Sequence, residues 1–215
     1  MMTTAPTQGR SGRSARQRLL DAADELFYDE GVHTVGIDRI IERAGVAKAS
    51  LYNSFGSKEE LIEAYLDNRH AGTMARLTDA VQQHTDPVAR VYAIFDAQAE
   101  MLAQPNFRGC AFISASAEAP PGGAIEHAAD SYRADIRNLF TDLVEAAGAP
   151  DPATLGRQLH MIYDGAILSA QMDRDPSIAV AARAAVTALL DAALPSGSRR
   201  QPQAHPTTPP TKEHS

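Results

Sequence analysis

Three features of the sequence predict an all-α fold. Alternation of apolar and polar residues with a period of two is almost absent, so there is hardly any strand signal. Alanine, leucine and the long charged residues, which favour helix, dominate the chain. Apolar residues recur at spacings of three and four residues over most of the first 194 positions. The 215 residues are enough for one large domain, or for a small domain joined to a larger one.

The predicted helices follow one another with short connections. They cover about residues 14–30, 37–44, 48–54, 58–82, 86–103, 110–118, 124–147, 151–172 and 176–193. The first helix has its apolar positions at Leu19, Leu20, Ala23, Leu26 and Phe27. Gly31 follows at the place where a helix C-cap would lie.

The second and third helices are short and are joined by a tight turn at Gly45-Val46. Their apolar positions are Ile37, Ile40, Ile41 and Ala44 in the second helix, and Leu51 and Phe55 in and just after the third. Neither helix can bury its apolar face alone, so both need the first helix as a cover. This is helix-turn-helix geometry, in which the second short helix can enter a DNA major groove about 12 Å wide.

The later helices begin at recognisable caps. Ser57 and Glu60 have the S-x-x-E spacing of a capping box, in which each side chain pairs with a backbone donor of the other residue. Asp-Pro pairs at 86–87, 151–152 and 175–176 place an acceptor at the N-cap and a proline at the first helical position. The loop at residues 120–123, Pro-Pro-Gly-Gly, separates the short helix at 110–118 from the long helix after it.

Charge is distributed unevenly along the chain, although the net charge is −7. Residues 1–58 hold eight Lys or Arg and seven acids, whereas the remainder holds 12 and 20. Residues 1–20 contain four arginines and no acid. The pattern predicts that a polyanion would be held at the N-terminal end only, because the acidic body would repel it.

Several classes of protein are excluded by composition. Cys110 is the single cysteine, so no intrachain disulfide and no cysteine-based zinc cluster can form. Charges interrupt the apolar stretches, as Arg183 does in the alanine-rich run near the C-terminus, which argues against a membrane-spanning helix. The N-terminus lacks the apolar core of a secretory signal, and we therefore expect a cytoplasmic protein that does not contact membranes.

The outward side of the helix at 48–54 is small and polar, which suits direct contact with DNA. Lys48 can donate to a guanine edge or a phosphate, and Ala49 permits close approach or touches a thymine methyl group. Tyr52 and Asn53 can hydrogen-bond phosphate oxygens. The alternative for Tyr52 is a core aromatic with an exposed hydroxyl, and for Lys48 a solvated surface charge.

Two further positions flank this helix. Lys58, at the start of the following helix, is a candidate phosphate contact, helped by the positive end of that helix, or else a surface charge. Gly36, before the second helix, has no side chain, so only its backbone N–H is available to a phosphate.

Residues 16–66 strongly resemble the DNA-binding domain of the tetracycline-repressor (TetR) family of bacterial transcription regulators. The resemblance is carried by A-G-V at 44–46, L-Y-x-x-F at 51–55 and G-S-K at 56–58. It implies that DNA is touched by Lys48, Ala49, Ser50, Tyr52, Asn53 and Lys58. The sequence departs from the family pattern at Gly36, where Ser or Thr is common, and at Asn53, where His or Arg is frequent.

The resemblance also implies a C-terminal helical domain that holds a small-molecule pocket and forms a homodimer through its last two long helices. Apolar stripes agree with this, at Leu155, Leu159, Ile162 and Ala166 in one helix and Ile178, Ala182, Ala185, Leu189 and Ala192 in the other. Such stripes suit a four-helix bundle built from two subunits, although the alternative is that they fill the core of one subunit. The candidate pocket residues, each of which can also be plain core, are Tyr92, Phe95, Met101, Phe107, Phe112, Met161 and Tyr163.

We therefore expect a flexible basic arm (1–13), a helix-turn-helix domain (14–57), a ligand-binding and dimerisation domain (58–194) and a disordered tail (195–215). The expected function is that of a homodimeric regulator, a repressor released from a pseudo-palindromic double-stranded DNA operator by a small-molecule effector. Motifs of hydrolases, nucleotide-binding enzymes and zinc proteases are missing, so no catalytic residue, cofactor or metal is predicted.

Three alternatives remain open. The first is a helical ligand-binding or scaffold protein without sequence-specific DNA binding. The second is a helical enzyme with a metal site at Glu126, His127 and Asp130, whose spacing also fits an exposed helix face. The third is a redox-sensing role for Cys110, against which stands the ordinary inertness of a buried cysteine.

Overall fold

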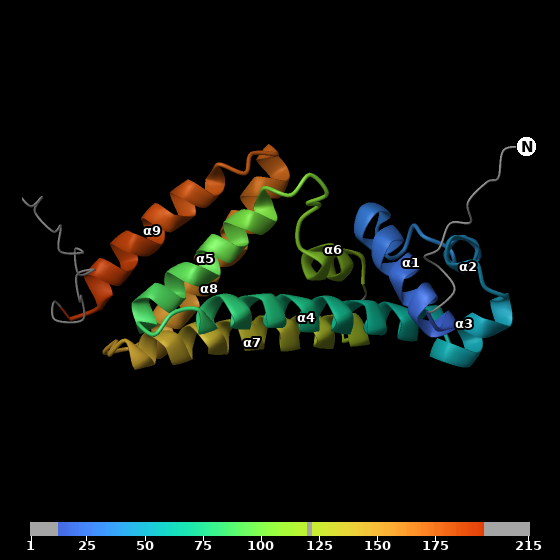
Figure 1. Cartoon of the computed structure of the whole chain (residues 1–215), viewed down its shortest axis with the longest axis horizontal. Coiled ribbons are helices and arrows are strands. Elements are labelled where there is room, and N and C mark those ends of the chain that lie inside the picture. The colour runs from blue at the N-terminus through green and yellow to red at the C-terminus, as the bar shows by residue number, and fades with distance from the viewer. Residues whose placement is uncertain (1–12, 120–121, 196–215) are drawn as a thin grey trace, which may run out of the picture.

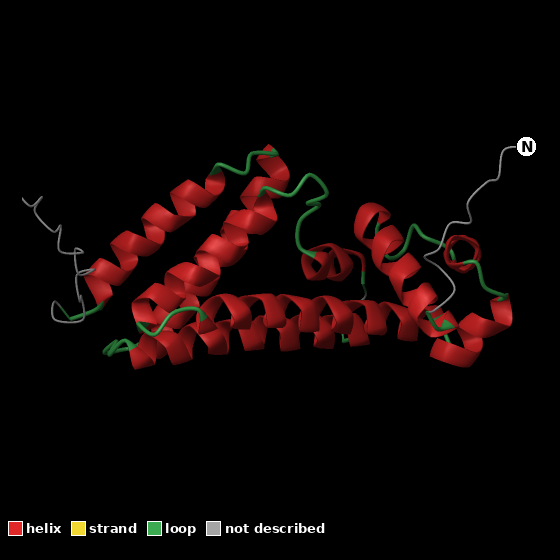
Figure 2. Ribbon diagram, in the orientation of Figure 1, coloured by secondary structure: helices red, strands yellow, loops and turns green. Residues whose placement is uncertain are grey.

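The computed structural model describes residues 13–119 and 122–195 and consists, over those residues, of helices and loops without a strand (Figure 2). The all-α prediction is confirmed. The expected arm and tail, apart from Arg13 and Pro195, lie outside the described residues. The helices are α1 (Ala15–Glu30), α2 (Ile37–Ala44), α3 (Lys48–Phe55), α4 (Lys58–Gln82), α5 (Pro87–Leu102), α6 (Ala111–Glu118), α7 (Ala124–Ala146), α8 (Pro152–Asp173) and α9 (Ile178–Ala193).

Helices α1, α2 and α3 form a small unit at one end of the molecule (Figure 1), called the reading unit below. The Ser14 hydroxyl accepts a hydrogen bond from the Gln17 N–H and so caps α1. Gly45 ends α2 in the left-handed conformation, at φ 62°, which a glycine adopts without strain. Helix α1 packs on both short helices, and Leu19, Ile40 and Leu51 between them are fully buried. The predicted covering role of the first helix is therefore confirmed.

Helix α4 runs along the long axis of the molecule and joins this unit to the remaining helices (Figure 1). It packs against α1 at one end and against α5, α6 and α7 along the rest of its length. Helices α7 and α8 make the most extensive helix pair, and α9 covers α5 and α8. The α7–α8 approach is close at Gly156, where an added Cβ would lie 3.0 Å from the backbone N and Cα of Thr141.

Two predicted helix starts differ in detail from the structure. The Ser57 hydroxyl accepts from the Glu60 N–H, but the Ser57 N–H bonds to the Phe55 carbonyl, so only one half of the capping box forms. Helix α9 begins at Ile178, because the Asp175 carboxylate accepts from the Ser177 N–H and hydroxyl instead of capping a helix that starts at Pro176.

The apolar stripe expected to form the subunit interface on α8 faces the interior. Leu155, Leu159 and Ala166 are all buried within this one chain. The large apolar side chains exposed on this part of the molecule are instead Met161 (67%), Leu168 (43%) and Met172 (74%) on α8 and Val180 (73%) on α9. Helix α8 is apolar on two faces. The assignment of the face with Leu155, Leu159 and Ala166 to a subunit interface was wrong, because this face is buried within the chain.

Candidate nucleic-acid interface and ligand pocket

Helix α3 is held by one face and presents the other to solvent. Leu51 and Phe55 are buried at 0% and 6% exposure, and the Arg16 guanidinium lies 4.8 Å from the centroid of the Phe55 ring. On the opposite face Lys48, Ala49 and Asn53 are exposed, Tyr52 is 46% exposed and Ser50 is half-buried. Tyr52 is therefore not a core aromatic. The interior fixes the helix while its polar side stays available.

Lys48 forms an ion pair with α2 across the turn. Its Nζ lies 3.0 Å from Oδ1 of Asp38, and this contact raises the pKa of the Lys48 ammonium. Both side chains are well exposed, so the pair can exchange partners at little free-energy cost. Ala47 and Gly36 start α3 and α2 without a side-chain cap, which leaves the first N–H groups of these helices free for an anion such as phosphate.

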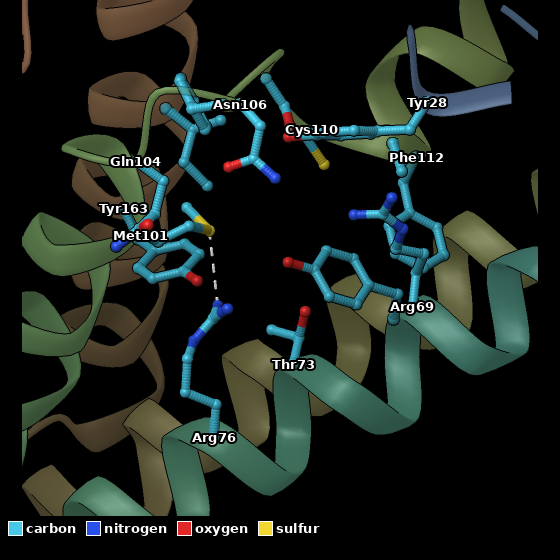
Figure 3. Close-up of a pocket in the computed structure, with 15 residues that line it drawn as sticks. Tyr28, Arg69, Thr73, Arg76, Met101, Gln104, Asn106, Cys110, Phe112 and Tyr163 are labelled. Atoms are coloured by element: carbon cyan, nitrogen blue, oxygen red, sulfur yellow. Dashed lines mark hydrogen bonds between the residues drawn. The ribbon is translucent and has the colours of Figure 1, made fainter. Parts of the chain in front are cut away.

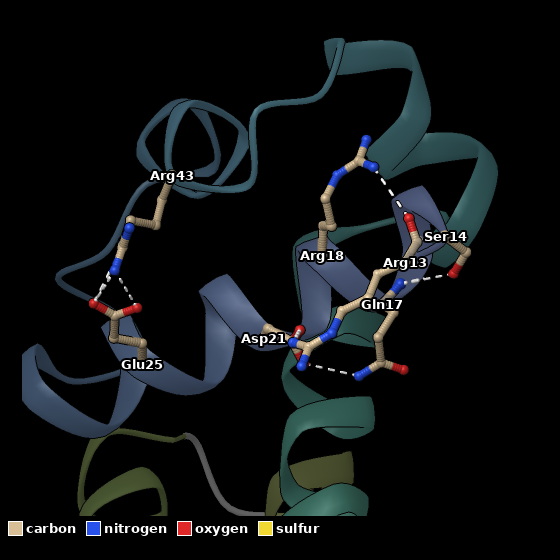
Figure 4. Close-up of polar contacts among 7 residues, drawn as sticks. All are labelled: Arg13, Ser14, Gln17, Arg18, Asp21, Glu25 and Arg43. Carbon is tan, nitrogen blue, oxygen red and sulfur yellow. Dashed lines mark hydrogen bonds and ion pairs between the residues drawn. The ribbon is translucent and has the colours of Figure 1, made fainter. Parts of the chain in front are cut away.

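The flanking basic residues differ in their surroundings. Lys58 is half-buried at the start of α4, beside the acidic Glu59 and Glu60. Arg13 pairs with Asp21, and Arg43 forks onto both carboxylate oxygens of Glu25 (Figure 4). These two arginines are thus balanced by acids on α1. Arg16, which the sequence reasoning counted only as charge, is exposed next to α3.

A pocket of about 190 Å³ lies behind the reading unit, where α1, α4, α5, α6, α7, α8 and the segment between α5 and α6 converge (Figure 3). Its wall is made of Tyr28, Arg69, Thr73, Arg76, Met101, Gln104, Asn106, Phe107, Gly109, Cys110, Ala111, Phe112, Tyr132, Tyr163 and Ile167. A larger hollow of about 660 Å³ beyond Gln104 and Phe107 is lined mainly by exposed residues. The lining of the smaller pocket is mostly buried or half-buried, so this pocket is the candidate ligand site.

Four of the seven predicted ligand residues line this pocket, namely Met101, Phe107, Phe112 and Tyr163. The other three lie elsewhere. The Tyr92 hydroxyl donates to Thr187 of α9, and Arg183 stacks over its ring. Phe95 packs in the core, with its ring 5.6 Å from that of Phe140. Met161 is on the exposed face of α8, at 67% exposure, and is not part of the lining of this pocket.

The sequence reasoning missed the polar wall that α4 contributes. Arg69, Thr73 and Arg76 are spaced by four and three residues, so they share one face of the helix. That spacing was a readable signal in a helix that otherwise packs between others. Tyr28 and Tyr132, from α1 and α7, were also missed, and no local pattern marks them.

The two arginines of this wall differ in their partners. Arg69 forms a bidentate pair with Asp24 of α1, with Nε–Oδ1 at 2.6 Å and Nη2–Oδ2 at 2.9 Å. Arg76 has only a contact from Nη2 to the sulfur of Met101, at 3.4 Å. Its Nε is buried and, among the described residues, has no hydrogen-bond partner.

Burial also controls the titrating groups around the pocket. It raises the pKa of Tyr163 to about 12, against the opposing effects of the Arg76 charge and of close approaches by Tyr132 and Arg76. Even so, the Tyr163 hydroxyl has no aligned hydrogen-bond partner among the described residues. Burial likewise raises the pKa of the Cys110 thiol. A raised pKa keeps that thiol protonated and so opposes the reactivity that redox sensing requires.

The pocket wall is tied directly to the reading unit. The Tyr28 hydroxyl donates to the Gly109 carbonyl (3.1 Å) and accepts from the Arg108 N–H (3.0 Å). The Glu118 carboxylate of α6 accepts from the His33 N–H (2.9 Å) in the loop after α1. Together with the Arg69–Asp24 pair, these contacts couple the position of the pocket wall to that of α1.

The described residues contain neither a metal-binding cluster nor a membrane-spanning helix. There, no group of three His, Cys, Asp or Glu side chains is placed to hold a metal ion, and Glu126 accepts instead from the Gly122 N–H. In the same part of the chain, no helix has the length and apolar character needed to cross a bilayer.

Comparison with family models gives two matches. Residues 19–65 match the model described as bacterial regulatory proteins, tetR family. Residues 116–193 match the model described as tetracyclin repressor-like, C-terminal domain. Between them these models cover most of the reading unit and most of α6–α9.

Solved structures extend the likeness over nearly the whole described chain. SCO4454, a TetR-family transcriptional regulator from Streptomyces coelicolor, is 35% identical with a TM-score of 0.80, covering 83% of this chain and 95% of its own. The regulator sav143 from Streptomyces avermitilis is 33% identical with a TM-score of 0.76, covering 84% and 98%.

Curated relatives match over a shorter stretch. The transcriptional activator FasR of Mycolicibacterium smegmatis is 40% identical over 82 residues, 38% of this chain and 37% of FasR. The transcriptional repressor KstR2 of Mycobacterium tuberculosis is 32% identical over 89 residues, 41% and 44% of the two chains. The matching segment thus spans less than half the length of either regulator.

Proposed function

Because this chain belongs to the TetR family of transcriptional regulators, we propose that it is a homodimeric repressor that leaves a pseudo-palindromic operator when a small molecule binds. Repression is the proposed direction of control, as in KstR2, although FasR is an activator. Such a protein acts on DNA in the cytoplasm. The proposed domains remain 14–57 for DNA binding and 58–194 for ligand binding and dimerisation.

The observation that carries the proposal is the free polar face of α3. Lys48, Ala49, Tyr52 and Asn53 form a surface that no helix of the described residues covers, while the apolar face of the same helix is anchored in the core. A helix held in this way fits a major groove, where small side chains allow close approach and Lys48 supplies a donor. In the complex, Lys48 exchanges Asp38 for a phosphate or a guanine.

A dimer is supported by the exposed apolar side of α8 and α9. Met161, Leu168 and Met172 follow one another at spacings of seven and four, so they share one outer face of α8. Val180 adds a fourth large apolar group on α9. A patch of this kind marks a protein interface, and pairing α8 and α9 of two copies makes a four-helix bundle. Operator binding by such a two-fold dimer requires the two α3 helices to lie about 34 Å apart, in successive major grooves.

Ligand response is proposed to act through α4 and α1. The pocket is lined by Arg69 of α4 and Tyr28 of α1, and both residues also hold the reading unit against the rest of the chain. A ligand that binds better when these contacts are rearranged favours a spacing of the α3 helices that does not fit DNA. Only such differential affinity shifts the equilibrium.

Fluorescence anisotropy with DNA from the region flanking the gene tests DNA binding. We expect sequence-specific binding that is strongly weakened in Lys48→Ala. The slope of log K against log salt should also fall by about 0.9 for each phosphate that Lys48 neutralises in the parent complex. The control is Arg90→Ala on α5, a cation remote from α3 whose Nε donates to the His84 carbonyl. Equal binding of all DNA sequences, or none at low salt, would favour a scaffold or ligand-binding protein instead.

Light scattering tests the dimer. The double variant Met161→Lys, Met172→Lys should run as a monomer and lose tight operator binding, because charge replaces apolar surface at the interface. Gln82→Lys, an exposed position on α4, adds charge elsewhere and should stay dimeric. A double variant that remains dimeric would move the interface away from this face of α8.

A further inference from the structure

The pocket holds a positive charge that nothing in the described structure balances. Arg76 enters it from α4, and its only described hydrogen bond goes to the Met101 sulfur, a weak acceptor (Figure 3). No ion pair of Arg76 is present in the described ranges, and its Nε is buried without a partner. Arg76 as a whole is half-buried. A charge that is partly removed from water without a partner is unfavourable, so the arrangement is suited to a ligand that supplies the partner.

Neutral donors surround this guanidinium. The Tyr163 hydroxyl is buried and has no aligned hydrogen-bond partner among the described residues, and its raised pKa keeps it protonated and able to donate. Thr73, one turn before Arg76 on α4, points toward the same space (Figure 3). Arg69 is already neutralised by Asp24, which leaves one unmatched positive charge in the wall. One charge with two hydroxyl donors matches a carboxylate better than a dianionic phosphate.

The rest of the wall is apolar and aromatic apart from the amides of Gln104 and Asn106. Phe112 and Tyr132 stack with ring centroids 4.0 Å apart, and Met101, Phe107 and Ile167 complete this side. At about 190 Å³ the pocket is smaller than the range of about 300–1,000 Å³ usual for drug-sized ligands. A small ligand with an apolar body therefore fits the space.

We propose that the effector is a small organic acid whose carboxylate binds Arg76 and the Tyr163 hydroxyl, with its apolar body against the Phe112–Tyr132 wall. This inference rests on the proposed function, since it names the chemical class of the molecule that releases the DNA. It also gives a hydrogen-bond partner to two of the three buried side-chain polar atoms that have none among the described residues, the third being His160 Nε2. Arg69 keeps Asp24 and serves the link to α1, so the two arginines have separate tasks.

Calorimetry with matched acid and amide probes tests the proposal. Benzoate and hexanoate are compared with benzamide and hexanamide, which keep the shape and remove the charge, and with inorganic phosphate. We expect at least one acid to bind at least about tenfold more tightly than its amide, as a charge-assisted hydrogen bond requires. Equal affinity of acid and amide, binding of phosphate as tight as that of the acids, or no binding of either acid would overturn the proposal.

The variant Arg76→Met tests whether Arg76 causes the preference for acid over amide. Arg90→Met is the matched control outside the pocket. Arg76→Met should abolish the preference for acid over amide, whereas Arg90→Met should keep it. Because an unpaired charge is removed, free Arg76→Met should melt no lower than the parent protein. A marked loss of stability would contradict the unpaired state of Arg76 on which the proposal rests, and an acid preference that survives in this variant would show that Arg76 does not bind the ligand.

Tyr163→Phe provides a second arm that keeps the ring and removes a hydroxyl without a described partner. It should weaken benzoate binding several-fold and leave benzamide binding nearly unchanged; equal effects on both would contradict the assigned role. Operator binding is measured on the same preparations. If specific DNA binding is absent and the acid preference is present, only the proposed function is refuted. If specific DNA binding is present and the acid preference is absent, only this inference is refuted.

Discussion

The ion pair between Asp24 and Arg69 offers a sharp test of how the reading unit is fixed to the rest of the chain. Asp24→Asn keeps the shape of the side chain but removes its charge and turns one of its two acceptors into a donor that faces the guanidinium. Arg69 also lies 3.9 Å from the centroid of the Tyr28 ring, so its departure would break that cation–π interaction as well. The variant therefore leaves a half-buried cation incompletely paired.

The size of the effect follows from geometry and exposure. Hydrogen bonds to charged groups contribute about 1.5–3 kcal/mol when well buried, whereas exposed ion pairs contribute about 0–1 kcal/mol. The side chains of Arg69 and Asp24 are 28% and 31% exposed, so solvent screens the pair in part. We expect a loss of about 1–2 kcal/mol in the free energy of unfolding. For a chain of this size that lowers the melting temperature by roughly 2–8 °C.

The matched control is the next residue of the same helix. Glu25→Gln makes the same chemical change in the ion pair between Glu25 and Arg43, which joins α1 to α2. The side chains of Arg43 and Glu25 are 44% and 50% exposed. Glu25→Gln should leave the melting temperature nearly unchanged, because an exposed ion pair contributes little. Circular dichroism at one fixed protein concentration measures both variants. Equal melting temperatures for the two variants would refute the argument from burial.

Three further predictions concern the reading surface, the helix packing and pH. Asp38→Asn frees Lys48 and removes a negative charge facing DNA, so operator affinity should rise by about two- to fivefold per subunit in anisotropy titrations; weaker binding would show that the ion pair positions Lys48. Gly156→Ala should lower the melting temperature, because the overpacking costs about 1–3 kcal/mol and the gain in helix propensity is smaller. Gly72→Ala, with open space around it, should raise the melting temperature slightly. The reverse order of the two melting temperatures would refute the close packing at Gly156. Burial lowers the pKa of His160, so the folded state resists protonation of this residue. In urea titrations, the free energy of unfolding should keep the full His160 contribution above about pH 6.5 and decrease below that pH. If His160→Gln shows the same decrease, His160 is not its source.

The surroundings of His160 explain why its pKa falls. Its ring is buried at 3% exposure, and Arg133 and Arg137 add positive charge nearby. The Asp164 carboxylate, 3.4 Å from its Nε2, opposes the shift but is itself bound by Arg133 at 2.6 Å. Protonation would therefore add a cation to a site whose one acid is already engaged.

The sequence alone determined the helices and the outward face of α3. Helix starts and ends depend on residues within one turn, such as Ser14 and Gly45, so local patterns predict them well. Where a competing local hydrogen bond was available, as at Asp175 with Ser177, the boundary moved by two residues. The exposed side of α3 followed from helical periodicity once Leu51 and Phe55 were assigned to the core.

Only the tertiary structure decided which apolar face of α8 is inside and which residues meet in the pocket. A helix with two apolar faces gives the same sequence pattern whichever face is buried, so Leu159 and Met161 could not be assigned from spacing. Tyr28, Arg76 and Tyr163 come from three helices far apart in the chain, and their approach depends on how those helices cross. The absence of an ion pair at Arg76 among the described residues is likewise a property of its neighbours, because it depends on which side chains the surrounding helices bring close.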